Sequence, residues 1–412
     1  MFKLDNPVRP YSWGSVTAMA DLFRRAPSGS PEAEMWIGAH PGSPSIAEAP
    51  DGSILPLDEL ISSSPTALLG SQTAEVFSGR LPFLAKILAA GSPLSLQVHP
   101  NLEQARDGFK AENEVGLPLS SEHRNYKDAH HKPEMIVALS PFDALCGFRS
   151  PAVARELLLE LGSHFSHRGA STPEPIRITA ELLGEEDTGL REGLSYLLAG
   201  DHLVAEAVAA SVELLAGLPS VRAEFSALVG LGRAYPGDPG VLISLLLNHV
   251  SLQPGEAIYL PAGNVHAYLA GVGFEVMASS DNVLRGGLTS KHVDVAEFLK
   301  TVDFRTMDTP RLQAQEPAAG IKRWVPPFRE FQVERIKANA QAGAVPLNQN
   351  GPVLVLAIEG QGDVSIPGAS LKLSAGESAF VPANAQSLTL QAAGGASPPF
   401  VAFAVTVGKA AV

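Results

Sequence analysis

The sequence predicts a mainly β protein that is interrupted by one α-helical insertion. Before residue 150 and after residue 249, short runs of alternating apolar and polar residues are broken by Pro and Gly, which is typical of β structure. Between these parts the apolar residues recur at helical spacing instead. At 412 residues the chain is long enough for two or three cores. We therefore expect a β domain of residues 1–149 and 249–308, a helical domain of residues 150–248, and a second β domain of residues 309–412.

The N-terminal part is expected to be rich in short strands. One short helix is predicted around residues 16–23, within the first 100 or so residues. Asn101 is a suitable N-cap, and it begins a polar segment that runs to Asn113. We expect this segment to be an exposed helix or loop over the mouth of the β domain.

The insertion is expected to contain several helices. Pro151 stands at the start of the run PAVARELLLELG, where a proline is favoured at the first helical position. Three more segments of the same kind follow before residue 248, and strand-like alternation is nearly absent. The histidines of this region are expected to be solvated, namely His164, His167 and His202.

Composition excludes several classes of protein. The formal net charge of −13 argues against nucleic acid or an anionic membrane surface as a partner. Cys146 is the only cysteine, so no intrachain disulfide can form and a reducing compartment is expected. The sequence shows no apolar run typical of a signal peptide or of a membrane span. We expect a cytoplasmic protein.

The segment PGEAIYLPAGNVHAYL, from Pro254, is the most informative piece of the sequence. It predicts a strand over residues 257–260, a tight turn at Pro261 and Gly263, and a second strand that opens with His266. An ordinary β-hairpin with a surface histidine is the alternative. The spacing Gly-x5-Pro-x-Gly-x2-His resembles the second signature motif of the cupin superfamily, whose members are double-sheet jelly rolls. The resemblance implies that the histidine points into the barrel and binds a metal.

Two more strands supply candidate ligands. In LSLQVHP, alternation places Gln97 and His99 on one face of a strand. Glu134 stands at the head of another apolar strand. One amide oxygen, two imidazoles and one carboxylate suit zinc, with manganese and ferrous iron as alternatives, and glutamine is the least common ligand among them. His130 and His131 are left out of the ligand set, because neighbouring residues of an extended chain point in opposite directions.

The motif with His266 recurs near the C-terminus without its histidine. LSAGESAFVPANAQSLTL, from Leu373, aligns with the segment from Leu252 and keeps its turn residues. The alignment pairs Gly376 with Gly255, Pro382 with Pro261, Asn384 with Gly263, and Ser387 with His266. It predicts a degenerate jelly roll without a metal, with a structural or interface role. Because Gly and Pro punctuate many hairpins, coincidence is the alternative.

Charged residues near the proposed metal suggest a pocket. Arg285 is followed by Gly286 and Gly287, which suits an arginine that grips an anion or a polyol oxygen. A structural ion pair between Arg285 and Asp281 is the alternative. Lys86 lies inside the apolar run LPFLAKILAA, where a lysine requires a charged partner or must snorkel, and we favour the pocket for it.

Taken together, these pieces resemble the type I mannose-6-phosphate isomerases (phosphomannose isomerases) over essentially the whole chain. The matching motifs occur in the order YSWGS, AEMWIGAHP, LPFLAKIL, LSLQVHPN, NYKDAHHKPEMIVAL, LLLNHVSLQPGEAIYLPAGNVHAYLAG, FEVMASSDNVLRGGLTSKHVD and AGESAFVPAN. The runs around QVHP, HKPE and SDNVLRGGLT are the most specific. The sequence departs from the family at Ser12, where some members have an acidic residue, and between Ala129 and His131.

The resemblance implies a site as well as a fold. Its zinc ligands, for one Zn²⁺ per chain, fall on the four residues that spacing had suggested: Gln97, His99, Glu134 and His266. The family's catalytic arginine falls on Arg285. Its pocket residues fall on Trp13, Glu34, Lys86, Ser95, Lys132, Glu275 and Asp281.

The family's reaction interconverts mannose 6-phosphate and fructose 6-phosphate, as part of mannose metabolism that includes GDP-mannose biosynthesis. A proton moves between C2 and C1 through a cis-enediol, while zinc and Arg285 stabilise the charge on oxygen. The residue that carries the proton is left open between Glu275, Lys132 and a zinc-bound water. We expect a monomer whose only partner is the small sugar phosphate.

Two other functions are considered. A non-catalytic sugar-binding cupin has no need for an intact ligand set around an open metal site. A different metal-dependent cupin enzyme, such as an oxygenase, typically binds ferrous iron with a histidine-rich ligand set. Gln97 in place of a further histidine disfavours redox iron.

Overall fold

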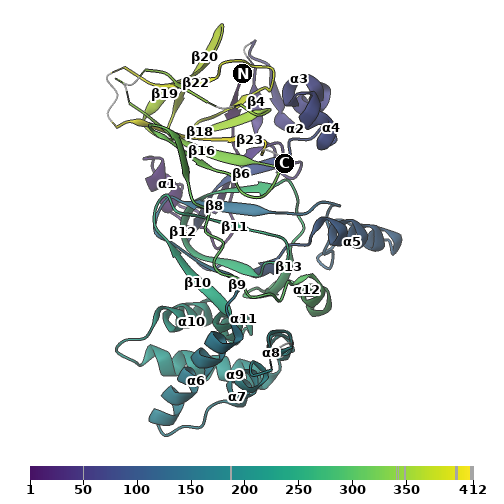
Figure 1. The fold of residues 1–412 in the computed structure, drawn as a ribbon, viewed down its shortest axis with the longest axis vertical. Coiled ribbons are helices and arrows are strands. Elements are labelled where there is room, and N and C mark those ends of the chain that lie inside the picture. The colour runs from purple at the N-terminus through teal and green to yellow at the C-terminus, as the bar shows by residue number, and fades with distance from the viewer. Residues whose placement is uncertain are drawn as a thin grey trace.

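The computed structural model of this chain describes residues 1–49, 51–185, 188–339, 341, 343–347, 349–394 and 398–408. Figure 1 shows a layered molecule, with helices at one end, a large sheet in the middle and two further sheets at the other end. All the strands of the described residues lie before residue 150 or after residue 246, as the alternating patterns predicted, although helices also occur in both of these parts.

The central sheet contains the strands of the sequence motifs. Its strands are β2 (Val8–Arg9), β3 (Glu34–Gly38), β6 (Phe83–Ala90), β7 (Leu96–Val98), β8 (Glu134–Ala138), β9 (Phe142–Phe148), β10 (Leu247–Leu252), β11 (Ala257–Leu260), β12 (His266–Ala278) and β13 (Leu284–Gly287). The long strand β12 pairs with β6, β7, β8 and β9, so it connects the two sides of the barrel. Strand β13 pairs with β7, and β11 pairs with β8. The strand over residues 257–260 and the strand start at His266 are confirmed.

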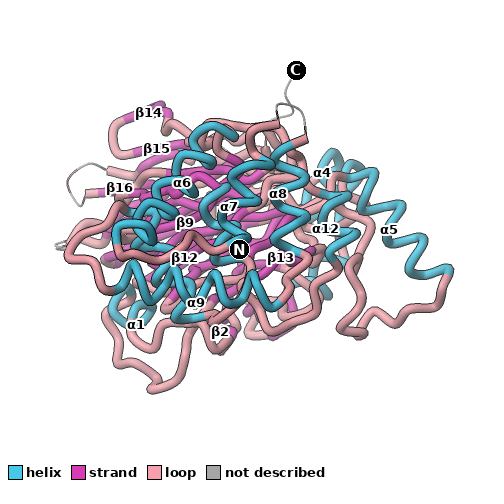
Figure 2. The backbone as a smooth tube through the Cα atoms, turned by 90° about the horizontal axis from the view of Figure 1, so that it is seen from below, coloured by secondary structure: helices cyan, strands magenta, loops and turns pink. Residues whose placement is uncertain are grey.

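The helices of the insertion lie at one end of this sheet. They are α6 (Pro151–His167), α7 (Glu174–Leu182), α8 (Gly189–Leu198), α9 (His202–Ala216), α10 (Ala223–Ala234), α11 (Gly240–Ile243) and the 3-10 helix η1 (Ser244–Leu246). Figure 2, seen from below, shows α6 to α9 lying across the end of the sheets. Leu96, Val98 and Leu284 share a core with these helices. The helices therefore support the apolar faces of β7 and β13, which leaves the opposite faces free for polar residues.

The far end of the molecule holds two more sheets. One nine-stranded sheet has the order β14 (Gln315–Ala318), β15 (Ile321–Trp324), β16 (Gln332–Ala338), β23 (Phe400–Thr406), β18 (Val353–Glu359), β21 (Ser378–Val381), β1 (Phe2–Asp5), β4 (Ile46–Glu48) and β5 (Ile54–Pro56). A four-stranded sheet has the order β17 (Val345–Pro346), β22 (Thr389–Ala392), β19 (Gln361–Ile366) and β20 (Ala369–Ser374).

The nine-stranded sheet joins the two ends of the chain. Strand β1 pairs with β21, with Leu4 opposite Ser378, and β4 pairs with β1. Strands from the first 60 or so residues thus complete a sheet made mostly of residues after 309, so residue 309 does not separate one sheet from another. The division into residues 1–149 with 249–308, residues 150–248 and residues 309–412 therefore stays a proposal about the sequence, and it does not describe separate sheets.

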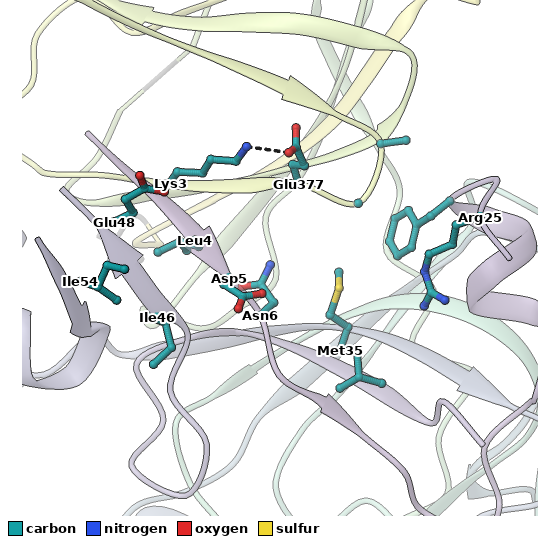
Figure 3. Close-up of a pocket in the computed structure, with 14 residues that line it drawn as sticks. Lys3, Leu4, Asp5, Asn6, Arg25, Met35, Ile46, Glu48, Ile54 and Glu377 are labelled. Carbon is teal, nitrogen blue, oxygen red and sulfur yellow. Dashed lines mark hydrogen bonds and ion pairs between the residues drawn. The ribbon is translucent and has the colours of Figure 1, made fainter. Parts of the chain in front are cut away.

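The repeated turn is present in both copies. Gly255 and Gly376 adopt positive φ angles of 91° and 89°, a conformation that glycine tolerates without strain. In each copy a short strand, β11 or β21, follows the glycine, and a turn follows the proline after that strand. Ser387 lies before β22 rather than at a strand start like His266. A cleft of about 670 Å³ lies between the turn at Gly376 and the N-terminal strands (Figure 3), where Lys3 pairs with Glu377 at 2.6 Å.

The predicted helices near residues 20 and 101 are confirmed. They are α1 (Ala18–Leu22) and α5 (Leu102–Glu114), and Asn101 forms a capping box with Gln104. Four helices and a strand were not predicted: α2 (Leu57–Ser63), α3 (Pro65–Leu69), α4 (Ser71–Val76), α12 (Val295–Thr301) and β14. These segments span only four to seven residues each, which is too short for a periodic pattern. Among the described residues, no helix combines the length and apolarity needed to cross a membrane.

Candidate active site

Three side chains from different strands meet inside the barrel. His99 follows β7, Glu134 begins β8 and His266 begins β12. One ligand atom from each lies within 4.8 Å of the others. The Nε2 atoms of His99 and His266 lie 3.2 Å and 3.6 Å from the two carboxylate oxygens of Glu134. All three residues are at most 2% exposed, so the group is enclosed by protein.

The three converging atoms face one another but make no hydrogen bond within the described part of the chain. His99 Nε2, His266 Nε2 and Glu134 Oε2 are buried and accept or donate no hydrogen bond. A buried polar atom without a partner is costly, so three of them in one place call for a bound group. Two imidazole nitrogens and a carboxylate are the donor set of a divalent transition metal, zinc above all. The residues therefore fit a metal ion.

Hydrogen bonds on the far side of each ring orient the imidazoles. His99 Nδ1 donates to the Asn282 carbonyl at 2.7 Å, and His266 Nδ1 donates to the Asn264 carbonyl at 2.9 Å. These bonds leave the Nε2 lone pairs free for a metal. Burial lowers the pKa of His99 to about 4, which keeps its ring neutral at physiological pH. Burial opposes ionisation of Glu134, but the Lys132 ammonium outweighs it and holds the pKa of this carboxyl well below its ordinary value.

Gln97 lies between the metal group and Arg285. In the sheet it stands opposite His266 on one side and Arg285 on the other. Its neighbours Leu96 and Val98 are fully buried against the helices, so Gln97 projects to the opposite face as alternation predicted. Together with Glu134, Gln97 lines a cavity beside the metal group.

A cavity of about 360 Å³ opens beside the metal group. It contains every residue that was predicted for the pocket: Trp13, Glu34, Lys86, Ser95, Lys132, Glu275, Asp281 and Arg285. These residues come from segments that are more than 270 residues apart in the sequence, between Trp13 and Arg285. The structure therefore brings the predicted site residues together in one place.

Lys86 has two carboxylate partners and also lines the cavity. Its Nζ lies 3.2 Å from Glu275 Oε2 and 3.5 Å from Glu34 Oε1. Burial disfavours its charge, but Glu34, Glu275 and Glu134 together raise the pKa of Lys86 above its ordinary value. Trp36 Nε1 donates to the other oxygen of Glu34 at 2.7 Å. The charged-partner interpretation of Lys86 is confirmed, and snorkelling is not needed.

The two candidate proton carriers differ in their surroundings. Burial and the nearby carboxylates of Glu134 and Glu34 raise the pKa of Glu275 above its ordinary value. Lys132 is buried, and its Nζ lies 3.2 Å from Glu134 Oε1. His99 Nε2 lies close to the same carboxylate oxygen. Glu275 is therefore a stronger proton acceptor than Glu134, while Lys132 compensates the charge of Glu134.

Arg285 does not pair with Asp281. Asp281 pairs with His40 instead, with its Oδ1 3.4 Å from His40 Nε2. Among the described residues, Arg285 forms no ion pair with an acidic side chain. The Gly42 N–H donates to His40 Nδ1 at 3.1 Å, so the proton of a neutral His40 ring lies on Nε2, toward Asp281. The structural ion pair considered for Arg285 is therefore wrong. Burial lowers the pKa of Arg285, and its charge faces the cavity without an acidic partner in the described chain.

The adjacent histidines lie outside the metal group, as expected. His131 Nε2 contacts Glu330 Oε1 at 2.8 Å, and His130 Nε2 lies 2.6 Å from an Arg80 nitrogen. Five residues that line the cavity or contact the site residues were not predicted from the sequence. They are His40, Lys291, Tyr268, Asn264 and Asn282. Lys291 was visible as the cation that closes SSDNVLRGGLTSK, and it lines the cavity near Arg285.

The double-sheet barrel and its buried His–Glu–His group define a metal-binding protein of the cupin class. The family model described as "Phosphomannose isomerase type I, catalytic domain" matches residues 1–151 of this chain. The chain belongs to the type I mannose-6-phosphate isomerase family, because its similarity to members of that family extends over almost its whole length.

The similarity is seen in both sequence and structure. The chain is 37% identical to "Mannose-6-phosphate isomerase" of Escherichia coli strain K12, over 96% of this chain and 98% of that one. It is 31% identical to "Mannose-6-phosphate isomerase 1" of Arabidopsis thaliana, over 92% and 88% of the two chains. A solved zinc-bound mannose 6-phosphate isomerase superimposes with a TM-score of 0.86 at 33% identity, covering 99% of each chain. A variant of phosphomannose isomerase from Salmonella typhimurium gives a TM-score of 0.88 at 33% identity, over 99% of this chain and 100% of that one.

Proposed function

We propose that this chain is a zinc-dependent aldose–ketose isomerase that interconverts mannose 6-phosphate and fructose 6-phosphate. The observation that carries the proposal is the group of three buried ligand atoms that make no hydrogen bond within the described residues, beside a cavity lined by Arg285, which has no acidic partner among the described ion pairs. A metal ion and an anionic, oxygen-rich substrate complete both features. Membership of the isomerase family supports the choice of reaction.

The metal is held by His99, Glu134 and His266, with Gln97 as the fourth ligand. Gln97 stands opposite His266 in the sheet and lines the cavity with Glu134, which supports its place in this set. When bound, zinc supplies a Lewis acid that stabilises negative charge on the sugar oxygens. Lys132 keeps Glu134 ionised, so the carboxylate remains a ligand at neutral pH.

The cations at the cavity supply the rest of the recognition. Arg285 and Lys291 both line the cavity, burial lowers the pKa of each, and neither has an acidic partner among the described ion pairs. Two such cations suit a dianionic phosphate or the oxygen on which charge develops. We assign Arg285 to the oxygens nearest the metal, because it stands opposite Gln97 in the sheet. Lys291 then contacts the phosphate. Trp13, Glu34 and Ser95 line the same cavity and complete the sugar pocket with Asp281.

Glu275 is our choice for the residue that moves the proton between C2 and C1. Its carboxyl is buried, lines the cavity and has a raised pKa, which suits a general base. Lys86 lies 3.2 Å away and holds the carboxylate in the ionised form before reaction. Lys132 is the competing candidate, but its contact with Glu134 gives it another task.

The test is a coupled assay for fructose 6-phosphate formed from mannose 6-phosphate. The purified protein is assayed as isolated, after chelator treatment, and after zinc add-back, with its metal content measured in parallel. We expect activity to follow zinc content. Mannose without a phosphate is the matched control, and it should be a far poorer substrate. Full turnover by metal-free protein, or iron content with oxygen consumption, would overturn the proposal.

Two further proposals concern the molecule in the cell. We propose a monomer, because the N-terminal strands β1, β4 and β5 are paired within the chain's own nine-stranded sheet. We propose a cytoplasmic location, because the one cysteine is buried and no disulfide is available to it. Light scattering after gel filtration tests the first proposal, and fractionation of cells tests the second.

A further inference from the structure

Asn282 connects several parts of the candidate active site through hydrogen bonds. It is fully buried, and it lies in the segment between β12 and β13. Its backbone carbonyl accepts the Nδ1 hydrogen bond of His99 at 2.7 Å. Its side chain contacts the segment 127–130, and Arg285 follows it by three residues. No step of the proposed reaction uses this residue directly.

The side-chain amide of Asn282 is fully occupied by backbone atoms of another segment. Its Oδ1 accepts from the backbone N–H groups of Lys127 and Asp128 at 2.7 Å and 3.2 Å. Its Nδ2 donates to the backbone carbonyls of Asp128 and His130, both at 2.8 Å. An asparagine amide offers two donors and two acceptor sites, and all four are used here. No smaller or apolar side chain can replace these contacts.

Asp128 and Ser280 extend this connection. The Asp128 carboxylate accepts from the backbone N–H groups of His130 and Asp281, each at 2.9 Å. It also accepts from the Ser280 hydroxyl at 2.9 Å. We call the side chains of Asp128, Ser280 and Asn282 the Asn282 clasp. The clasp binds the segments 127–130 and 280–282 to each other.

The clasped segment leads directly into two residues of the metal centre. Lys132 follows His130 by two residues, and Glu134 by four. The chain between residues 115 and 133 contains no helix or strand, so regular backbone pairing does not fix it. Glu112 and Arg124 hold the backbone of residues 124–126, and the clasp supplies for residues 127–130 the order that a helix or sheet gives elsewhere. It does so from the same residue whose carbonyl orients His99.

We propose that Asn282 is a positioning residue that sets His99, Lys132 and Glu134 in place before the metal binds. Groups that orient metal ligands from behind contribute to metal affinity, although they do not touch the metal. The inference rests on the proposed function for the identity of the metal, but not for the reaction.

The experiment measures zinc affinity of the full-length Asn282→Ala protein by competition with a chelator, in the absence of sugar. We expect zinc to bind about 10- to 100-fold more weakly than to the wild type. With zinc at saturation, we expect kcat to remain lowered while KM changes little, and the absorption spectrum of the cobalt-substituted protein to differ from that of the wild type. Asn350→Ala is the matched control, since the Asn350 amide donates to the Val407 and Gly408 carbonyls far from the metal group. It should lower the melting temperature and leave zinc affinity unchanged.

Ser280→Ala keeps the test decisive if Asn282→Ala does not fold. This substitution removes one hydroxyl, which contacts Asp128, the His130 carbonyl and the Asn282 N–H, and keeps the Asn282 amide, so we expect a smaller loss of zinc affinity. Wild-type zinc affinity and cobalt spectrum in folded Asn282→Ala would overturn the inference. If that variant does not fold, the same result for Ser280→Ala would overturn it. A wild-type protein that binds zinc but does not isomerise the sugar phosphate would overturn the proposed function alone.

Discussion

Lys86 and Glu275 stand opposite each other on β6 and β12, with Lys86 Nζ 3.2 Å from Glu275 Oε2. Both residues are buried, and Glu34 reaches the same ammonium from β3 at 3.5 Å. One cation thus serves two carboxylates inside the wall of the cavity. A buried charge that loses its partner is strongly unfavourable, so this arrangement must be kept or replaced as a unit.

Lys86→Met should therefore destabilise the protein at neutral pH. We expect the free energy of unfolding to fall by about 3–5 kcal/mol, because Glu34 and Glu275 are left buried without the cation. Without Lys86 the pKa of Glu275 rises further, so protonation restores part of the stability as the pH falls. Urea unfolding at neutral and mildly acidic pH measures both effects. The double variant Lys86→Met with Glu275→Gln should recover part of the loss at neutral pH, and no recovery would show that the pair is not coupled.

Arg285→Ala should retain zinc and lose most of its activity. Arg285 lines the cavity without an acidic partner among the described ion pairs, so its removal exposes no buried carboxylate. Loss of one fixed charge at the reacting oxygens is expected to lower kcat about 100- to 1,000-fold. Steady-state kinetics and metal analysis of the same preparation check this, with Arg285→Lys as a control that keeps the charge. A parallel fall in zinc content would make Arg285 a structural residue instead.

The metal site predicts different outcomes for two histidines. His266→Ala should lose zinc, since His266 Nε2 is one of the three converging atoms. His131→Ala should retain zinc, because His131 contacts Glu330 instead. Metal content after dialysis measures the difference. Zinc bound at 100 times its dissociation constant stabilises a folded protein by about 2.7 kcal/mol, so wild type and His131→Ala should show a zinc-dependent rise in melting temperature that His266→Ala lacks.

The zinc-free protein should lose stability on acidification through His99. Burial lowers the pKa of this ring from 6.5 to about 4. The neutral His99 ring therefore makes its full contribution to the free energy of unfolding above pH 6.5, and this contribution decreases as the pH falls toward 4. The folded state then takes up fewer protons than the unfolded state, and we expect a loss of about 2 kcal/mol between neutral pH and about pH 5. The pKa of Glu134 is held below its ordinary value of 4.5, so protonation of Glu134 changes the free energy of unfolding only at pH values below that range and not between neutral pH and about pH 5. Thermal unfolding of the zinc-free protein measures the slope, which His99→Gln should reduce; equal slopes would contradict the assignment.

Local patterns in the sequence were sufficient to predict the strands that carry the metal group. Pro261 and Gly263 mark the turn between β11 and β12, and the next strand starts at His266 as predicted. Alternation along β7 was enough to place Gln97 on the face opposite Leu96 and Val98. These inferences depend on the period of a strand and on turn chemistry, both of which are properties of a few neighbouring residues.

Contacts between distant segments left no comparable pattern in the sequence. The pairing of β1 with β21 joins residues more than 370 positions apart and was not predicted. Asn282 was missed for the same reason, because its amide contacts the backbone of Lys127, which lies 155 residues earlier. A backbone partner can be any residue type, so such a contact cannot be read from side-chain identity. His40 was not predicted, because its place at the site depends on its contact with Asp281, a residue from a distant part of the sequence.

Gly286 provides a last prediction, because it lies against α12 where β13 carries Arg285. A Cβ at this position would lie 2.3 Å from Cζ of Phe298, a distance that no real Cβ contact tolerates. Phe298 is fully buried in the core shared with the helices, so its ring can move only by disturbing that core. Gly286→Ala should therefore lower the free energy of unfolding by about 1–3 kcal/mol and reduce kcat, because the displaced strand carries Arg285 with it. Gly230→Ala, with nothing within 4 Å of its added Cβ, is the matched control inside α10 and should be neutral or slightly stabilising. Urea unfolding and steady-state kinetics of both variants decide the matter, since wild-type stability and kcat in Gly286→Ala would mean that the ring of Phe298 moves without moving Arg285.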